Sequence, residues 1–125
     1  MFELTISSQF SGAHRLRHLH GKCEELHGHN WKVEASVISN RLNRDGVVID
    51  FKILKEKLEK VLGTLDHHYL NDLPCFSKGE PSCENIARYI FNQLKKELRR
   101  YSASLNKVTV WESDTTRATY QERSR

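Results

Sequence analysis

The chain has 125 residues, a length that fits one domain, residues 1–125, with a modest hydrophobic core. No apolar run approaches the ~18 residues of a membrane span or forms a secretory signal, so we expect a cytoplasmic protein. Three cysteines without a Cys-x-x-Cys spacing argue against a disulfide framework. The net charge of +4 favours an anionic partner, either nucleic acid or a phosphorylated small molecule.

Two alternating segments, residues 2–14 and 29–39, predict the first two strands. In each segment apolar residues recur at every second position, which is the period of one face of a strand. His14 shares the apolar parity of the first segment, and His27 and His29 share that of the second. If the two strands pair as antiparallel neighbours, the three imidazoles converge at one end of one sheet face.

Three histidines with an open fourth position are the ligand set typical of a catalytic zinc site. The alternative is that each histidine is a hydrogen-bonded packing residue near the core. Because all three share one phase and a cysteine lies close by in the sequence, we favour the metal site and predict Zn²⁺ on His14, His27 and His29.

Cys23 lies four positions before His27, in a polar and histidine-rich segment of residues 15–25. Cationic surroundings lower the pKa of a thiol, so Cys23 is a candidate base. A cysteine beside zinc could instead be a fourth ligand, which would close the site and make it structural. The sequence leaves both roles open.

Two helices follow the turn at residues 43–46. Asp50 is the predicted N-cap of the first helix, whose apolar positions repeat at helical spacing from Phe51 to Leu65. Ser82 is the predicted N-cap of the second helix, and cationic residues in its last turns complement the helix dipole.

Two short strands, residues 107–113 and 116–122, complete the predicted chain. The order is strand, strand, helix, helix, strand, strand. This order predicts an α+β fold in which one four-stranded antiparallel sheet carries both helices on one face.

The segment 65–75 between the helices is predicted as a loop that contains Asp66 and His67. A turn would let this carboxylate fix the tautomer of the neighbouring imidazole, as in an acid–base pair. The alternative is an ordinary surface loop with two histidines, which the pattern alone favours slightly.

Glu112 shares the parity of Val108 and Val110, which places its carboxylate on the apolar face of a strand. A buried carboxylate requires a partner, either a Lys or Arg side chain or a ligand. The paired N–H groups of a pterin or guanine edge would match a carboxylate through two hydrogen bonds.

These residues together resemble the 6-pyruvoyl-tetrahydropterin synthase family over nearly the whole chain. The similarity lies in five features: His14, Cys23-x-x-x-His27-Gly28-His29, Leu65-Asp66-His67-x-x-Leu70-Asn71, Glu80-Pro81-Ser82-x-Glu84-Asn85 and Glu112. The three-residue gap between Cys23 and His27 is similar to the bacterial branch that forms 6-carboxytetrahydropterin for queuosine.

The resemblance implies a tunnelling fold, in which sheets of several subunits join into a barrel. It implies a homohexamer of two trimers with active sites at subunit interfaces. It also implies the following roles: zinc on His14, His27 and His29, Cys23 as the base, Asp66 and His67 as the partner acid–base pair, Glu112 as the pterin anchor, and Ser82 and Cys83 beside the pterin. Relatives carry Thr or Ser where this chain has Cys83, so that contact is a departure from the family pattern.

The implied reaction converts 7,8-dihydroneopterin triphosphate to 6-carboxy-5,6,7,8-tetrahydropterin, acetaldehyde and triphosphate. Arg15, Arg17 and Lys22 are the nearest basic residues in sequence that would bind the triphosphate. Two alternatives remain open: a synthase that eliminates triphosphate without cleaving the carbon chain, and a non-catalytic, zinc-stabilised module that binds nucleic acid. No aromatic-and-basic nucleic-acid face is visible in the sequence, so we expect neither a nucleic-acid nor a membrane partner.

Overall fold

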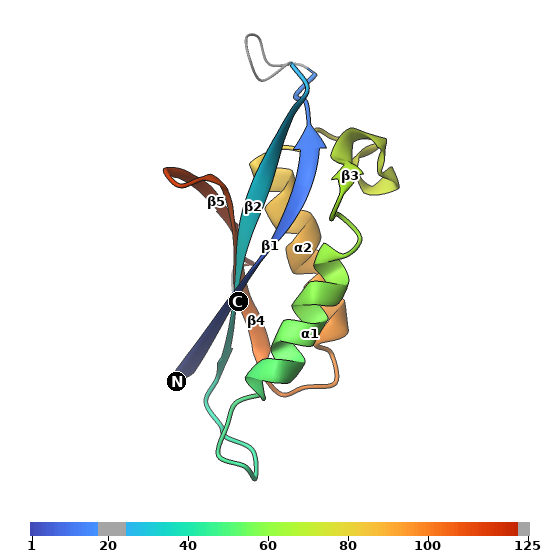
Figure 1. The fold of residues 1–125 in the computed structure, drawn as a ribbon. Coiled ribbons are helices and arrows are strands. Elements are labelled where there is room, and N and C mark those ends of the chain that lie inside the picture. Colours follow the sequence, from blue (N-terminus) through green and yellow to red (C-terminus); the bar gives the residue numbers. More distant parts are fainter. Residues whose placement is uncertain (18–24, 123–125) are drawn as a thin grey trace.

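One layer of β-sheet and two helices form the fold, and both helices pack on the same side of the sheet (Figure 1). The computed structural model describes residues 1–17 and 25–122. Its strands are β1 (Phe2–His14), β2 (His27–Ser39), β3 (His68–Tyr69), β4 (Ser104–Ser113) and β5 (Thr116–Tyr120). Its helices are α1 (Phe51–Leu62), α2 (Cys83–Glu97) and two short 3₁₀ turns, η2 (Leu70–Asp72) and η3 (Pro74–Phe76).

The sheet has five strands in the order β3-β1-β2-β4-β5. The β1–β2, β2–β4 and β4–β5 pairs are antiparallel, whereas β3 runs parallel to β1. The predicted α+β class is confirmed, and the prediction of a four-stranded, wholly antiparallel sheet is wrong. The missed strand, β3, pairs His68 and Tyr69 with Gly12 and Ala13. Two residues are too few to show an alternating pattern, so only the edge of β1 defines this strand.

The bounds of three other strands differ from the sequence prediction, and β5 ends at Tyr120 rather than at residue 122. Strand β2 begins at His27 rather than at residue 29, because His27 pairs with His14. Strand β4 begins at Ser104 rather than at residue 107, because its pairing with β2 continues past an irregularity between Ser36 and Val37. Such a bulge inserts a register shift that a strict period of two does not predict.

The core lies between the helices and the face of the sheet on which the predicted apolar positions lie. Fully buried side chains of β2 and β4 meet fully buried side chains of both helices: Trp31, Val33, Ala35, Val37, Val108, Val110, Leu54, Leu58, Ile86, Ile90 and Leu94. The opposite face is polar, and Gln9, Asn30 and Lys32 are exposed on it. We call this uncovered side the open face of the sheet.

Both helices begin at the predicted caps. The Asp50 side chain accepts a hydrogen bond from the backbone N–H of Lys52 at 2.9 Å, and Ser82 accepts one from Asn85 at 3.1 Å. Such caps satisfy N–H groups that lack a partner within the helix. Among the described residues, no helix is long and apolar enough to cross a membrane.

The two predicted core positions at the start of α1 differ in burial, and this difference is testable. Leu54 is fully buried, whereas Phe51 is 57% exposed. Leu54→Ala should lower the free energy of unfolding by about 2–5 kcal/mol, since it leaves a cavity. Phe51→Ala, the matched control, should cost less than about 1 kcal/mol. Urea denaturation measures both, and equal losses would contradict this packing.

Candidate metal centre and catalytic residues

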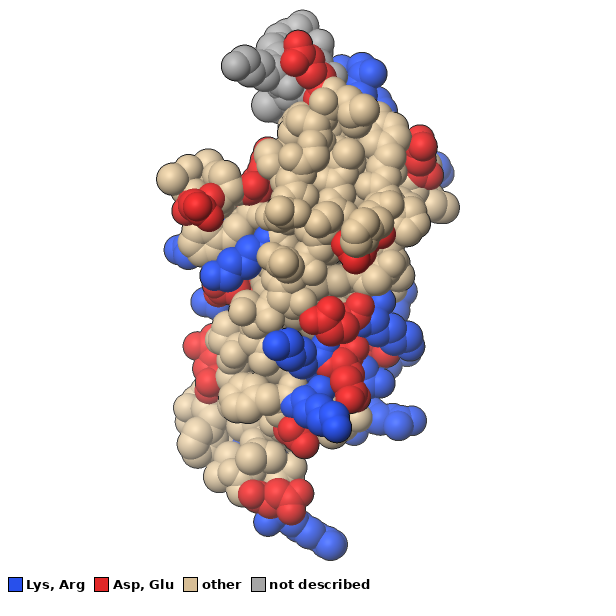
Figure 2. Space-filling view, viewed as in Figure 1, with Lys and Arg blue, Asp and Glu red and all other residues tan. Residues whose placement is uncertain are grey.

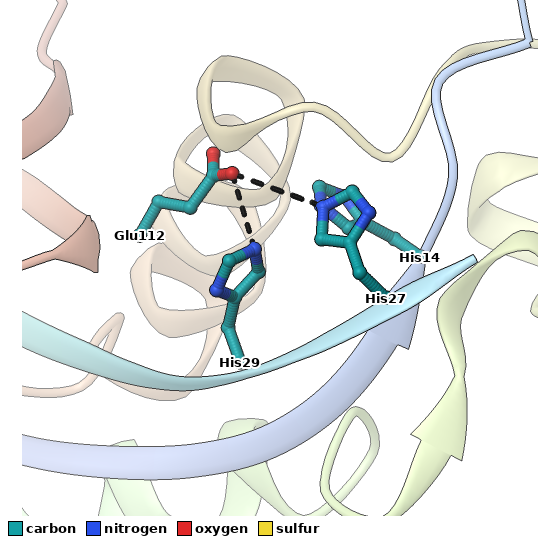
Figure 3. Close-up of side chains that lie close together, drawn as sticks. All are labelled: His14, His27, His29 and Glu112. Carbon is teal, nitrogen blue, oxygen red and sulfur yellow. Dashed lines mark hydrogen bonds and ion pairs between the residues drawn. The ribbon is translucent and has the colours of Figure 1, made fainter. Parts of the chain in front are cut away.

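Three histidines and one carboxylate converge at one end of the sheet, on its helix-covered face (Figure 3). His14 ends β1, His27 and His29 begin β2, and Glu112 lies near the end of β4. The ligand atoms of these four residues all lie within 4.8 Å of one another. The antiparallel register causes this convergence, because it sets His14 directly opposite His27.

Two backbone carbonyls determine which ring nitrogen of His14 and His27 faces the cluster. Nδ1 of His14 lies 2.7 Å from the Pro81 carbonyl oxygen, and Nδ1 of His27 lies 2.7 Å from that of Glu25. A carbonyl only accepts hydrogen bonds, so each Nδ1 carries the proton. Each neutral ring therefore presents a bare Nε2 lone pair to the cluster, which is the donor form for a metal.

The Nε2 atoms of His14 and His27 lie 2.7 Å apart, which is hydrogen-bond distance. With both Nδ1 atoms protonated, two lone pairs would repel at this distance unless a proton on one Nε2 or a metal ion lies between the rings. Nε2 of His29 is buried and makes no hydrogen bond to any described residue; it lies 3.2 Å from Oε1 of Glu112, within ion-pair distance but outside hydrogen-bond geometry. A cation bound by all four groups would satisfy these atoms.

Burial keeps two of the imidazoles neutral. Desolvation lowers the pKa of His14, outweighing the Pro81 hydrogen bond and the Glu112 charge, which raise it. Desolvation also lowers the pKa of His29, against the opposing effect of Glu112. Neutral imidazole is the form that binds metal ions, so these shifts favour binding near neutral pH.

The donor set fits zinc. Zinc takes imidazole nitrogens and carboxylate oxygens in fourfold coordination, and imidazole ligands suit it better than magnesium or calcium. Glu112 is either the fourth ligand or the neighbour of an open fourth position. The three predicted ligands are thus brought together, with a carboxylate that the sequence did not assign to them.

Within the described residues, Glu112 does not have the Lys or Arg partner that was one of the two expected from its sequence position. Its Oε1 lies 3.2 Å from His29, 3.9 Å from His14 and 4.0 Å from His27, and it forms no Lys or Arg ion pair within the described residues. Its side chain is 32% exposed, so its desolvation is partial. The alternating pattern that Glu112 shares with Val108 and Val110 predicted the correct face of the sheet. Only the β2–β4 pairing places Glu112 beside the histidines.

Asp66 and His67 form the predicted pair, because a left-handed residue turns the backbone between them. His67 has φ of 59°, and its Nδ1 lies 2.9 Å from Oδ2 of Asp66. The backbone N–H of Ser11 donates to the other carboxylate oxygen at 2.9 Å and is the main cause of a lowered Asp66 pKa. The carboxylate therefore stays ionised and orients an imidazole that is 81% exposed.

The Asp66–His67 pair does not share a site with the histidine cluster within one chain. His67 borders a hollow of about 470 Å³ whose walls also include Ser11, His29 and Asn30, and the exposed Asn30 lies on the open face. No hydrogen bond or ion pair in the described part of the chain joins Asp66 or His67 to the imidazoles or to Glu112. One subunit thus presents its two sets of chemical groups on two different faces.

Ser82 and Cys83 lie at the start of α2, beside the cluster. The Cys83 thiol donates a hydrogen bond to the Val110 carbonyl at 3.2 Å. Burial, assisted by the nearby negative charge of Glu112, raises the pKa of Cys83 to about 11. Cys83 is therefore a protonated thiol at neutral pH and not a base. The predicted base, Cys23, lies outside the described residues.

The sequence interpretation missed the carbonyls of Glu25 and Pro81. Pro81 belongs to a motif that was singled out, Glu80-Pro81-Ser82, but a backbone carbonyl has no side-chain signature. Its role follows only from the approach of His14, which is 67 positions away in sequence.

Comparisons with known proteins place this fold and site in the pterin-synthase class of enzymes. The family model for 6-pyruvoyl tetrahydropterin synthase matches residues 3–123, so the chain belongs to this family, as its motifs predicted. A Synechocystis sp. protein named 6-carboxy-5,6,7,8-tetrahydropterin synthase is 38% identical, with 89% of this chain and 86% of the relative covered. A Haemophilus influenzae protein of the same name is 34% identical, with coverage of 98% and 100%.

Relatives that are named 6-pyruvoyl tetrahydropterin or tetrahydrobiopterin synthase are also similar to this chain. The Drosophila melanogaster 6-pyruvoyl tetrahydrobiopterin synthase is 33% identical, with 78% of this chain and 66% of that protein covered. Among solved structures, the Caenorhabditis elegans 6-pyruvoyl tetrahydropterin synthase superposes with a TM-score of 0.88 and 30% identity, covering 98% and 96% of the two chains.

The lowered histidine pKa values predict how acid affects the metal-free protein. Between the folded pKa of His14 and its ordinary value of 6.5, the unfolded chain binds more protons than the folded chain. The free energy of unfolding should therefore fall as the pH drops from about 7.5 to about 5.5. Thermal melts in a chelator measure this change. His14→Gln should flatten the pH dependence, whereas the exposed control His68→Gln should keep it; an unchanged slope in His14→Gln would refute the assignment.

Proposed function

We propose that this protein is a zinc-dependent cytoplasmic lyase that converts 7,8-dihydroneopterin triphosphate and water to 6-carboxy-5,6,7,8-tetrahydropterin, acetaldehyde and triphosphate, a step in queuosine biosynthesis. The observation that carries the proposal is the cluster of three imidazoles and one carboxylate in a chain of the pterin-synthase family. The bacterial relatives named for the carboxy product support this reaction over others of the family.

His14, His27 and His29 would hold the metal through Nε2. Zinc bound there would lower the pKa of the substrate's side-chain hydroxyls and polarise an adjacent carbonyl. The chain's contribution is to keep the imidazoles neutral and aimed inward, through burial and through the carbonyls of Pro81 and Glu25.

Cys23 and the Asp66–His67 pair would move protons on opposite sides of the substrate's side chain. Asp66 accepts from Nδ1 of His67, which leaves Nε2 of that ring to take up or release a proton. Cys83 does not compete as a base, because its thiol remains protonated.

Glu112 would anchor the pterin through two hydrogen bonds from the 2-amino group and the ring N–H. Its partial exposure leaves the carboxylate accessible to a ligand. Ser82 and Cys83 would flank the ring at the start of α2, where the Cys83 thiol is already engaged by the Val110 carbonyl.

An active site shared between two subunits would bring the histidine cluster of one copy close to the Asp66–His67 pair of another. The histidine cluster lies on the helix-covered face, and His67 borders the open face, so each of two neighbouring copies would supply one of the two sets. Among residues 1–17 and 25–122, strand β5 pairs only with β4, and β1 pairs with β3 only at Gly12 and Ala13. These two unpaired sheet edges support the proposed joining of subunits into a barrel, with two trimers forming a homohexamer.

Arg15 and Arg17 remain candidates for the triphosphate. The Arg15 side chain is exposed and bonds to none of the described residues, so it is available to an anion. The Arg17 guanidinium donates to the Asn71 carbonyl at 3.3 Å and is already partly engaged. The third candidate, Lys22, lies outside the described residues.

The second candidate function is 6-pyruvoyl-tetrahydropterin synthase activity, in which triphosphate is eliminated and the carbon chain is kept. The Drosophila and Caenorhabditis relatives carry names of this type. A nucleic-acid module is less well supported. Figure 2 shows Lys and Arg side chains interspersed with Asp and Glu on the face in view, and Lys57 and Lys60 pair with Glu97.

Product analysis distinguishes the two reactions. The purified protein loaded with zinc should release 6-carboxy-5,6,7,8-tetrahydropterin and acetaldehyde from 7,8-dihydroneopterin triphosphate. Liquid chromatography with mass spectrometry identifies the pterin, and an aldehyde trap captures the two-carbon fragment. A pyruvoyl product without acetaldehyde would support the second candidate, and no turnover would refute both.

Substitution of Glu112 separates pterin recognition from metal binding. Glu112→Gln should weaken binding of a pterin ligand by about 2 kcal/mol or more, because an amide cannot accept two hydrogen bonds from that edge. Zinc content should stay at the wild-type level. Calorimetric titration with a pterin and metal analysis measure the two effects, with the exposed helix residue Glu56→Gln as the control. Loss of zinc with retained pterin affinity would make Glu112 a metal ligand instead.

A further inference from the structure

We propose that Asn71 is a positioning residue for the metal site, because its side chain fixes the backbone next to His14. The Arg15 N–H donates to Oδ1 of Asn71 at 2.9 Å, and Nδ2 of Asn71 donates to the Arg15 carbonyl at 3.0 Å. Asn71 is only 7% exposed, so this amide is committed to the backbone of Arg15 and shielded from water. This inference rests on the proposed zinc site.

The Asn71 amide continues the sheet where backbone pairing stops. Strand β3 pairs with β1 at Gly12 and Ala13 and ends at Tyr69. At Arg15, the amide of Asn71 supplies the donor and the acceptor that a further strand residue would supply. His14 therefore lies between two secured points on the β3 side, while β2 pairs with it from the other side through His27.

The ring of His14 is held as firmly as its backbone. The imidazole is 1% exposed, packs edge-on against Trp31, and donates from Nδ1 to the Pro81 carbonyl. A buried ring with one fixed hydrogen bond can aim Nε2 at a metal only if its Cα is also fixed. Asn71 provides that second constraint.

Arg17 connects Asn71, which fixes the backbone beside His14, to the segment of Pro81, which fixes the His14 ring. Its guanidinium donates to the Asn71 carbonyl at 3.3 Å, and its backbone N–H donates to the side-chain carboxylate of Glu80 at 2.8 Å. Glu80 comes one residue before Pro81 in the sequence. The same short segment that contains Asn71 also contains Asp66 and His67. Asn71 therefore couples the position of the metal ligand to the segment that carries the acid–base pair.

Zinc affinity, rather than activity, tests this role. In Asn71→Leu both hydrogen bonds are lost while the number and branching of the side-chain heavy atoms are kept. We expect the dissociation constant for zinc, measured by competition with a chromophoric chelator, to rise about 10- to 100-fold. The rise in melting temperature on adding zinc should shrink in parallel. Asn92→Leu, at an exposed position of α2, should change the affinity by no more than about twofold.

Asn71→Asp keeps the proposal testable if the leucine variant does not fold. The aspartate retains an acceptor for the Arg15 N–H but places a second oxygen against the Arg15 carbonyl, so zinc affinity should again fall. Lower melting temperatures with wild-type zinc affinity would show that Asn71 only stabilises the fold, and would overturn the positioning role alone. Failure of the wild-type protein to bind zinc would overturn the metal site and this role together.

Discussion

The antiparallel register between β1 and β2 is the constraint on which the rest of the site depends. Because side chains alternate with a period of two, pairing His14 with His27 brings His14, His27 and His29 to one face. A slip of one residue in this register would move His27 and His29 to the open face, while His14 would stay on the helix-covered face. The core prevents that slip, since the same register pairs Phe10 with Trp31, whose stacked rings are buried under the helices.

The histidine cluster imposes an electrostatic cost that a cation removes. Burial disfavours charged imidazoles, and the carbonyls of Pro81 and Glu25 direct the two Nε2 atoms at one another, so the metal-free site must hold either opposed lone pairs or an added proton that burial disfavours. A protein selected only for stability would place apolar side chains here. Local destabilisation of this kind is expected where function outweighs stability. The same electrostatic cost explains why hydrogen bonds with Asn71 hold the backbone beside His14.

The chemistry is divided between the two faces of one sheet. The metal ligands lie under the helices, whereas His67 turns outward through a left-handed backbone conformation that Asp66 and Ser11 maintain. A non-glycine residue in that conformation is uncommon and is often associated with function. Assembly through the free sheet edges would bring the two faces of neighbouring copies together, which makes oligomerisation part of the proposed mechanism.

The sequence by itself determined the local features of this protein, and the tertiary structure decided its long-range ones. Alternation and capping signals act over a few residues, so both long strands, the caps Asp50 and Ser82 and the shared phase of the histidines could be predicted. Strand β3, the position of Glu112 beside the imidazoles and the Pro81 carbonyl could not. Each of these depends on which distant segments become neighbours, and sheet order and backbone approach are set by the packing of the whole chain rather than by any local pattern.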